Sequence, residues 1–378
     1  MKRRLFTPGP VSIYPPALWA SLDANIHHRT PEFRAVLTDV MKRLQNIMGE
    51  PSELFVFAAS GSGGMEAAVS NFFSAGEEVL VASCGKFGER WIELARKFGL
   101  NAKVLTFPYG DAVPPEEIAS AIKSQPGLRG VFIQACESST GVQNDVESIA
   151  KIVGASDALL VVDAVSALAT MPLSFAMGVD VLVAASQKAI MIPPGLAFLG
   201  CSQRAWGRVA GNLTPRFYFD LRAAKKAWDE NGQTPFTPAT SLILGLQQSL
   251  QEIENVGLSR MIELTENLAR ATRAGLKALS LEIFAKRPAN ALTAVIAPQI
   301  GAEKITGELK KRFGIQVAGG QGEMKGRIFR IGHMGFIDHF DTLGLLSALE
   351  LILDSLGVRI VPGSSLTEFQ KIFSEVRS

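Results

Sequence analysis

The stretch "VDVLVAASQKA" (residues 179–189) places one lysine, Lys188, directly after an apolar run that is typical of a buried strand. An ammonium group at the end of such a strand is unfavourable unless another group pairs with it or the protein uses it. Taken alone, Lys188 fits a solvated loop position better. Its interpretation therefore depends on what the other stretches of the chain place beside it.

Lys188 follows one of seven short runs of apolar and β-branched residues, which alternate with helical patterns between about residues 50 and 202. Most of these runs are apolar on both faces, as strands are when helices cover both sides of a sheet. The pattern predicts an α/β fold with a mostly parallel, doubly wound sheet. The runs are 54–60, 78–83, 103–107, 130–136, 158–164, 180–186 and 196–202.

Beyond about residue 257 the pattern changes to a long helical stretch followed by short strands and helices. A chain of 378 residues is too long for one ordinary hydrophobic core, so a division is expected. We predict an N-terminal arm over 1–20, a large domain over 21–257 and a smaller α+β domain over 258–378, to which the arm adds.

The composition favours a soluble enzyme of small molecules, or a scaffold, with no nucleic-acid or membrane partner. Its 38 Lys and Arg residues nearly balance 36 Asp and Glu residues. The start "MKRRLFTPGPVSIYPP" is basic, but its prolines interrupt any signal-peptide core, and no apolar run is long enough to span a membrane. Cys84, Cys136 and Cys201 lie far apart without a metal-ligand spacing, so we expect a reducing cytoplasm, no disulfide framework and no metal site.

A glycine-rich turn follows the first run, at the position where open α/β sheets bind ligands. In "SGSGGMEAAVSNFF" (60–73) this turn leads directly into an amphipathic helix. Free backbone N–H groups and the helix dipole then point at one place, which favours a phosphate. The spacing matches neither a dinucleotide fingerprint nor a P-loop. The alternative is a turn whose glycines only let the helix pack closely on the strand.

Asp163 stands at the end of another run, "ALLVVDA" (158–164). A carboxylate at the tip of a buried strand needs a cation or an N–H donor to stay ionised, although capping of a following helix would also explain it. The combination with the glycine turn and Lys188 favours a function. Together they supply three needs of pyridoxal 5'-phosphate: a phosphate anchor, a counter-ion for the ring nitrogen and an amine for the aldehyde.

The sequence resembles the class V pyridoxal-phosphate-dependent aminotransferases over nearly the whole chain, most closely the serine–pyruvate and alanine–glyoxylate branch. The resemblance implies a fold-type I transferase, with the mostly parallel sheet in a large domain and a smaller α+β C-terminal domain. It is carried by the order and spacing of several motifs. They are "TPGP" (7–10), "SGSGGMEAA" (60–68), "ESSTGV" (137–142), "VVDAVSAL" (161–168), "SQKA" (186–189), "PFTPATSL" (235–242) and "FRIGHMG" (329–335).

This resemblance implies roles for residues at the cofactor ring. Lys188 looks like the Schiff-base lysine that also shuttles the proton, and Gln187 looks like a phosphate ligand. Asp163 matches the aspartate that pairs with the pyridine nitrogen. Phe87, in "CGKFGER", falls where relatives place an aromatic ring, often tryptophan, stacked on the pyridine.

Two other motifs imply further cofactor contacts. Ser62 and Gly63 fall in the phosphate-binding turn, and Gly64 falls at the neighbouring cofactor contact. In the motif "ESSTG", Ser138 and Thr140 match the hydroxyls near the ring and its phenolic oxygen.

Two residues are implied as substrate ligands. Arg330 matches the arginine that binds the α-carboxylate, which a planar guanidinium holds with two parallel hydrogen bonds. Gly9 of the arm falls at the substrate mouth, where its backbone N–H can donate.

Thr237 implies a homodimer with shared active sites, because it matches a threonine that reaches the cofactor phosphate of the partner subunit. Thr234 stands where relatives carry a tyrosine for a second contact of this kind, so that contact stays open. The stretch with His27, His28 and Arg29 varies with the substrate in related enzymes. These residues have two interpretations, as specificity residues of the second subunit or as solvated loop positions.

We therefore predict a transaminase that moves the amino group of a small amino acid, alanine or serine, to a 2-oxo acid, glyoxylate or pyruvate. The freed amine of Lys188 is expected to move the α-proton of the substrate. Two successive half-reactions predict ping-pong kinetics.

Three alternatives compete with this prediction. A transaminase of 2-aminoethylphosphonate or phosphoserine would need a further cation, for which Arg29 is the candidate. A desulfurase or lyase needs a nucleophilic cysteine shortly before the carboxylate-binding arginine, and residues 314–329 contain none. A non-catalytic partner protein, like chains of this family described as hydrogenase subunits, would not need the set of Lys188, Asp163 and Arg330.

Overall fold

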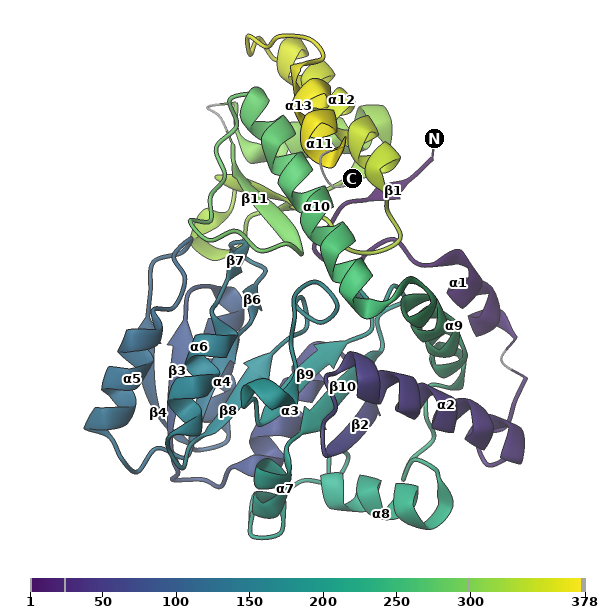
Figure 1. The fold of residues 1–378 in the computed structure, drawn as a ribbon, viewed down its shortest axis with the longest axis vertical. Coiled ribbons are helices and arrows are strands. Elements are labelled where there is room, and N and C mark those ends of the chain that lie inside the picture. Colours follow the sequence, from purple (N-terminus) through teal and green to yellow (C-terminus); the bar gives the residue numbers. More distant parts are fainter. Residues whose placement is uncertain (1, 24, 298–299, 375–378) are drawn as a thin grey trace.

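All seven predicted runs form strands of one sheet in the computed structural model, which describes residues 2–23, 25–297 and 300–374 (Figure 1). Across the sheet the strand order is β2-β10-β9-β8-β5-β3-β4. The strands are β2 (Glu53–Ala58), β3 (Glu78–Ser83), β4 (Asn101–Thr106), β5 (Gly130–Gln134), β8 (Leu159–Asp163), β9 (Val181–Ala185) and β10 (Leu196–Cys201).

Neighbouring strands of this sheet run parallel, except that β10 lies antiparallel to both β2 and β9. The predicted α/β fold with a mostly parallel sheet is confirmed. Because β2 and β9 both oppose β10, they share the direction of the other strands, and the carboxyl ends meet at one edge. Asp163 pairs with Gln134 on one side and with Val183 on the other, so these neighbouring strands reach that edge at the same level.

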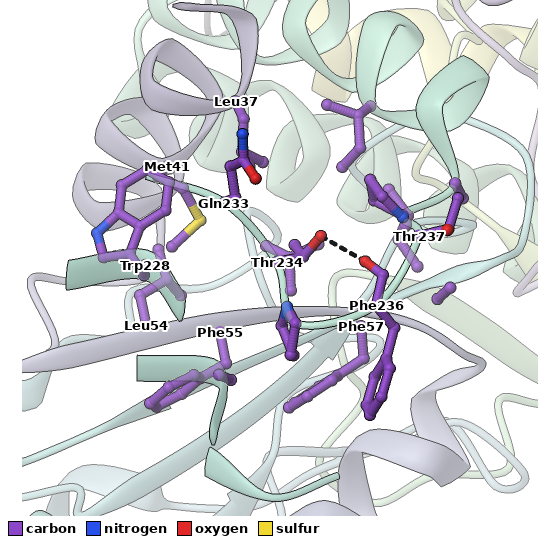
Figure 2. Close-up of a pocket in the computed structure, with 18 of the residues that line it drawn as sticks. Leu37, Met41, Leu54, Phe55, Phe57, Trp228, Gln233, Thr234, Phe236 and Thr237 are labelled. Carbon is purple, nitrogen blue, oxygen red and sulfur yellow. Dashed lines mark hydrogen bonds between the residues drawn. The ribbon is translucent and has the colours of Figure 1, made fainter. Parts of the chain in front are cut away.

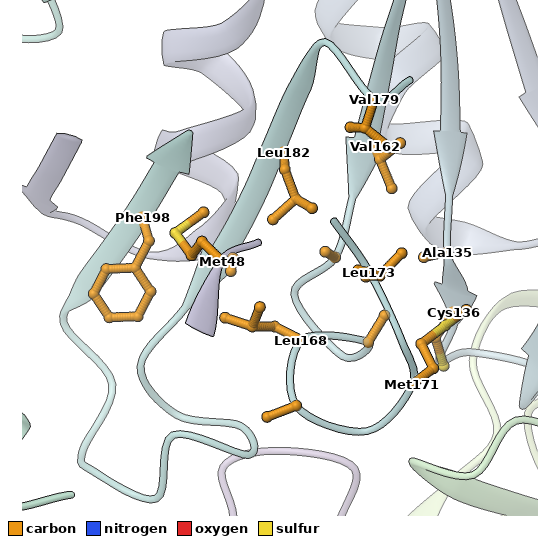
Figure 3. Packing of buried hydrophobic residues seen from close by; sticks show 14 of the residues in the cluster. Met48, Ala135, Cys136, Val162, Leu168, Met171, Leu173, Val179, Leu182 and Phe198 are labelled. Carbon is orange, nitrogen blue, oxygen red and sulfur yellow. The ribbon is translucent and has the colours of Figure 1, made fainter. Parts of the chain in front are cut away.

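Alternating side chains of the strands pack into two cores on opposite faces of the sheet. In β8, Leu159 belongs to one core and Leu160 to the other. Figure 3 shows side chains of the Leu160 core, including Val162 and Leu182 from adjacent strands. The Leu159 core is covered by α3 (Gly61–Phe72), α4 (Lys86–Lys97), α7 (Gln203–Val209) and α8 (Leu221–Asn231), and the Leu160 core by α2 (Pro31–Ile47), α5 (Pro115–Ser124), α6 (Val146–Gly154) and α9 (Thr240–Val256).

A second, antiparallel sheet of order β11-β14-β13 lies above the first in the view of Figure 1. The N-terminal arm packs beside this sheet, because β1 pairs in parallel with β12 in a separate two-stranded sheet and Phe6 is buried in a third core with Val295 of β11. The domain boundaries after residues 20 and 257 stay a prediction. The elements are β1 (Arg4–Leu5), β11 (Leu292–Ile296), β12 (Ile315–Gln316), β13 (Ala318–Gly319), β14 (Ile328–Gly332), α10 (Leu258–Ala278), α11 (Ala302–Phe313), α12 (His339–Ser355) and α13 (Ser364–Ser374).

The short hairpin of β6 and β7 lies between the two sheets in Figure 1 and carries the motif "ESSTGV". None of the described helices combines the length and the apolar character needed to cross a membrane. The remaining elements are α1 (Pro15–Leu22), β6 (Cys136–Glu137), β7 (Val142–Gln143) and two short 3-10 helices, η1 (Phe175–Met177) and η2 (Gly322–Met324).

Asn144 fixes the chain where it leaves β5 toward this hairpin. Its side-chain oxygen accepts from Val113 N at 2.8 Å, and its side-chain nitrogen donates to Gln134 O at 2.7 Å. Its own backbone N–H donates to Ala135 O at 3.0 Å. All four residues are buried, so these groups depend on one another for hydrogen bonds.

We predict that Asn144→Leu lowers the free energy of unfolding by about 2–4 kcal/mol, because it leaves a buried donor and a buried acceptor unpaired. Urea unfolding followed by circular dichroism measures the change. The matched control is Asn101→Leu, at an exposed asparagine that donates to Gly76 O at 2.9 Å. This control should lose less than about 1 kcal/mol. Equal losses at the two positions would contradict the role of Asn144.

Candidate active site

The carboxyl ends of the parallel strands surround a pocket of about 340 Å³. Its walls come from the segments that follow different strands: the glycine turn after β2, the start of α4 after β3, the hairpin after β5, and the loops after β8 and β9. The topology of the sheet therefore brings distant motifs to one place. The predicted residues that line the pocket are Gly9, Ser62, Phe87, Ser138, Asp163, Gln187 and Lys188.

Lys188 is buried in this pocket, with 8% of its surface exposed. Its Nζ donates a hydrogen bond to the backbone oxygen of Pro8. A Cβ atom at Gly9 would lie 2.6 Å from Nζ, so the close approach of the arm requires glycine. Burial lowers the pKa of Lys188 to about 8, and the nearby Cys136 and Asp163 oppose the shift. The amine therefore becomes a base just above neutral pH.

Asp163, the last residue of β8, is buried beside the same pocket. Its Oδ1 accepts a hydrogen bond from Val165 N at 2.9 Å. Burial raises the pKa of Asp163 to about 6, whereas the hydrogen bond from Val165 and the charges of Lys188 and Arg90 lower it. The carboxylate form therefore prevails at pH 7 and is stabilised further by any additional donor in the pocket.

The glycine turn opens α3 and supplies backbone donors. The N–H groups of Gly63 and Gly64 donate to Ser60 O at 2.8 and 3.3 Å. Within the described part of the chain, the N–H groups of Gly61 and Ser62 have no protein acceptor. Because both of these residues line the pocket, their N–H groups are the donors that remain for an anion.

Besides Thr237, three predicted cofactor contacts do not line the pocket: Gly63, Gly64 and Thr140. A Cβ atom at Gly64 would lie 2.8 Å from Val183 Cγ1 on β9, so glycine here lets α3 pack closely on the sheet. Thr140 is fully buried, and its hydroxyl donates to the backbone oxygen of Glu137 at 3.3 Å. Packing is therefore the visible role of these positions in a single subunit.

Helix α4 brings Phe87 and Arg90 to the pocket, and Arg90 was not predicted from the sequence. Its Nη1 donates to Ser62 Oγ at 3.0 Å. Its guanidinium carbon lies 4.7 Å from the centre of the Phe87 ring, in a cation–π contact. The sequence signal that could have indicated Arg90 was its spacing from Phe87, because residues three apart lie on one face of a helix.

A buried carboxylate, Glu137, holds the start of α4 against the hairpin and was also not predicted. Its Oε2 accepts from Phe87 N and Gly88 N, each at 3.0 Å, and its Oε1 accepts from the Ser139 hydroxyl at 2.6 Å. The Ser139 oxygen in turn accepts from Lys86 N at 3.0 Å. Burial raises the pKa of Glu137, and its hydrogen bonds with Ser139 and Gly88 lower it. The backbone of Phe87 is thereby fixed at the pocket.

Arg330 approaches the pocket from β14 of the second sheet. Its Nε donates to Gly319 O at 3.0 Å and its Nη1 to Ser138 O at 2.7 Å. Ser138 lines the pocket, so the guanidinium stands behind its wall although Arg330 is not itself a lining residue. Burial lowers the pKa of Arg330 to about 10, and Glu137 opposes the shift, so the side chain stays charged at neutral pH.

Thr237 and Thr234 line a different pocket, shown in Figure 2, beside strand β2. The Thr234 hydroxyl donates to the backbone oxygen of Phe236 at 2.7 Å. Arg29 donates to Thr234 O at 3.2 Å and also to the Gln233 side chain. Within one subunit, this segment is therefore separate from the Lys188 pocket.

Cys136 also lines the Lys188 pocket. Burial raises the pKa of its thiol, which is therefore uncharged at neutral pH. Cys84, Cys136 and Cys201 are all free. Among the residues that the structure describes, no group of three or more His, Cys, Asp or Glu could hold a metal ion.

The chemistry of the pocket fits pyridoxal 5'-phosphate. Gln187 Oε1 is buried without a hydrogen-bond partner among the described residues, so its amide has polar capacity left for a ligand. The unpaired N–H groups of Gly61 and Ser62 suit a phosphate. Asp163 provides a carboxylate for the ring nitrogen, and Lys188 provides the amine.

The lowered pKa of Lys188 leads to a prediction about its reactivity. In the cofactor-free protein, reductive methylation of Lys188 by formaldehyde should rise with pH, reach half of its maximum near pH 8 and level off at higher pH, because only the neutral amine reacts. Mass spectrometry of peptides reads each lysine separately. Lys151 is the control, because Glu147 raises its pKa and its labelling should continue to rise past pH 10. Parallel profiles for the two lysines would contradict the effect of burial.

Comparisons with known proteins agree with this geometry. The family model "Aminotransferase class-V" matches residues 17–326. The chain is 37% identical over 381 residues to the soluble hydrogenase 42 kDa subunit of Anabaena cylindrica, with 99% of each chain covered. It is 31% identical over 380 residues to the serine–glyoxylate aminotransferase of Methylorubrum extorquens, with 97% of this chain and 94% of the relative covered.

A solved structure shows the same fold. The aspartate aminotransferase of Thermus thermophilus matches with a TM-score of 0.87 at 33% identity, covering 93% of this chain and 99% of that chain. Fold, family model and relatives agree over almost the whole length. The chain therefore belongs to the class V aminotransferases, a family of enzymes that depend on pyridoxal 5'-phosphate.

Proposed function

We propose that this aminotransferase moves the amino group of alanine or serine to a 2-oxo acid, glyoxylate or pyruvate, by a ping-pong mechanism. The observation that carries the proposal is the convergence of Lys188, Asp163 and the glycine turn on one pocket, with the Arg330 guanidinium behind its wall. A serine–glyoxylate aminotransferase among the relatives supports this substrate class.

When bound, pyridoxal 5'-phosphate supplies an electron sink for the α-carbon of the substrate. The N–H groups of Gly61 and Ser62 would hold its phosphate, and Gln187 would donate to it through its side-chain nitrogen. The Asp163 carboxylate would keep a proton on the ring nitrogen, because each charge stabilises the other in a buried site. Phe87 would cover one face of the ring.

Lys188 would act as the general base and general acid of the reaction. Its pKa of about 8 lies near neutral pH, where a base is both available and strong enough to take a proton. Nζ would remove the α-proton of the substrate and later donate a proton at the position of the cofactor carbon C4'. The hydrogen bond to Pro8 O shows that Nζ reaches the side of the pocket that the arm covers.

Arg330 would bind the carboxylate of the amino acid and of the 2-oxo acid. Its Nε and Nη1 are held by backbone oxygens, whereas Nη2 has no acceptor among the described residues. Burial keeps water away from the guanidinium and so strengthens its attraction to an anion. Binding of the substrate carboxylate by Arg330 would fix the orientation of the substrate Cα–H bond relative to Lys188.

Two alanine variants test these roles. Lys188→Ala should lose turnover with every amino acid, because no other lysine lines the pocket. Arg330→Ala should mainly raise KM for alanine and serine, by about 10- to 100-fold, because it removes the partner of the carboxylate. The absorbance of the bound cofactor after addition of each amino acid reads the half-reaction, and Lys86→Ala, outside the pocket lining, is the control. Equal, modest losses from the two variants would count against the assigned roles.

We also propose that the functional unit is a homodimer with shared active sites. Thr237 lies apart from the Lys188 pocket of its own subunit, as a ligand of the partner's cofactor would. Large apolar side chains are exposed and offer surface for association, Trp19 and Leu22 on α1 at 71% and 73% and Phe217 at 80%.

Mixing two inactive variants tests the shared sites. Lys188→Ala removes the amine, and Thr237→Glu would place a negative charge against the phosphate of the partner subunit. A mixed dimer combines the intact Lys188 of one subunit with the intact Thr237 of the other, so random co-assembly should regain about a quarter of the wild-type activity. A mixture that regains no activity, or a monomer by light scattering, would contradict the proposal.

Two other interpretations carry less support. A second anion of a phosphorylated or phosphonate substrate would need a cation in the pocket, but Arg29 is exposed and bonded to the separate 233–234 segment. One relative is described as a hydrogenase subunit, which raises a non-catalytic role. The half-reaction spectra distinguish this role, because a scaffold would show no change with any amino acid.

A further inference from the structure

We propose that Arg90 is a positioning residue for the cofactor phosphate: it directs the Ser62 hydroxyl into the pocket as a hydrogen-bond donor and sets a positive charge beside it. The inference rests on the proposed placement of the phosphate at the glycine turn. Arg90 is the last residue of the stretch "CGKFGER", in which the resemblance implies a role only for Phe87, and its position at the pocket emerges from the fold.

The first argument is the direction of the Ser62 hydroxyl. Arg90 Nη1 donates to Ser62 Oγ at 3.0 Å, so this oxygen acts as an acceptor toward the guanidinium. The hydroxyl hydrogen must then point elsewhere, because the guanidinium has no acceptor for it. No described residue accepts it, and Ser62 lines the pocket. Ser62 therefore offers two donors to an anion, its hydroxyl and its backbone N–H.

The second argument is charge. Among the described residues Arg90 forms no ion pair with a carboxylate, although its partly buried side chain lines the pocket. A phosphate would supply the missing counter-charge. A hydrogen-bond chain from guanidinium to hydroxyl to phosphate also strengthens each link, because the charged donor polarises the hydroxyl.

The third argument is that the guanidinium is held in place. It lies over the Phe87 ring, 4.7 Å from its centre, and the backbone of Phe87 is fixed by the buried Glu137. A planar group clamped between a ring and a hydroxyl loses little further freedom when an anion binds. Arg90 thus contacts both Phe87 at the start of α4 and Ser62 in the glycine turn at the start of α3.

Calorimetric binding of pyridoxine 5'-phosphate and of pyridoxine tests the proposal on the full-length protein after removal of its cofactor. Neither compound has an aldehyde, so their binding requires neither attachment to Lys188 nor turnover. Arg90→Gln should bind pyridoxine 5'-phosphate about 10- to 100-fold more weakly, because a charge-assisted hydrogen-bond chain to the phosphate is lost. Its affinity for pyridoxine should change by less than about twofold. Arg90→Lys, which keeps the charge without the planar fork, should fall between Arg90→Gln and the wild type.

A double-variant cycle tests the route through Ser62. If Arg90 acts through this hydroxyl, Arg90→Gln combined with Ser62→Ala should bind pyridoxine 5'-phosphate about as weakly as the weaker single variant. Arg96→Gln removes the same charge from an exposed position on the same helix and is the matched control. It should bind both compounds like the wild type, and thermal unfolding should show that all variants fold.

Two outcomes would overturn the proposal. Equal losses for the two compounds would mean that Arg90 acts on the ring or on the fold rather than on the phosphate. Losses that multiply in the double variant would mean that Arg90 and Ser62 act independently. Both outcomes leave the proposed transamination untouched, whereas a wild-type protein that fails to bind pyridoxine 5'-phosphate would count against the cofactor placement itself.

Discussion

The shared direction of the strands is the constraint on which the rest of the site depends. Hydrogen bonding between parallel strands brings segments that are far apart in the sequence to one edge of the sheet. Asp163 ends β8, and Lys188 follows the end of the adjacent β9 by three residues. Each charge would be costly to bury alone, and each lowers the cost of burying the other. The fold thus makes a reactive amine tolerable in its interior.

Hydrogen bonds to the backbone, rather than side-chain packing alone, set the walls of this pocket. The Glu137 carboxylate holds backbone N–H groups of α4, and the Arg330 guanidinium holds the backbone oxygen of Ser138 in the hairpin. Backbone groups do not change with the side chain, so such contacts fix the course of the chain while leaving the lining free to vary. Substrate preference among related enzymes can then change through lining side chains without loss of the cofactor geometry.

Much of the fold was predictable because its strands are apolar on both faces, a pattern that few other structures produce. The antiparallel direction of β10 was not predicted, because an apolar run shows where a strand lies but not which way it points. At the site, position after strands suggested the glycine turn, Asp163 and Lys188 in combination, and the other residues followed only from the family resemblance. Glu137 was missed because its role arises from tertiary hydrogen bonds, which leave no periodic trace, whereas Arg90 could have been found from its helical spacing to Phe87. Gly64 shows the converse: a glycine in a phosphate motif that the structure uses for close packing against Val183.

The N-terminal arm contacts both Lys188 and the segment that holds Arg330. Strand β1 is hydrogen-bonded to β12, and three residues after β12 the backbone oxygen of Gly319 holds Arg330. A few residues after β1, the oxygen of Pro8 holds the amine of Lys188. A displacement of the segment 315–319 would therefore move the arm and the Arg330 guanidinium together, and with the arm the backbone oxygen that faces the Lys188 amine. For the proposed reaction, this arrangement couples the binding of the carboxylate at Arg330 to the cover over the amine of Lys188.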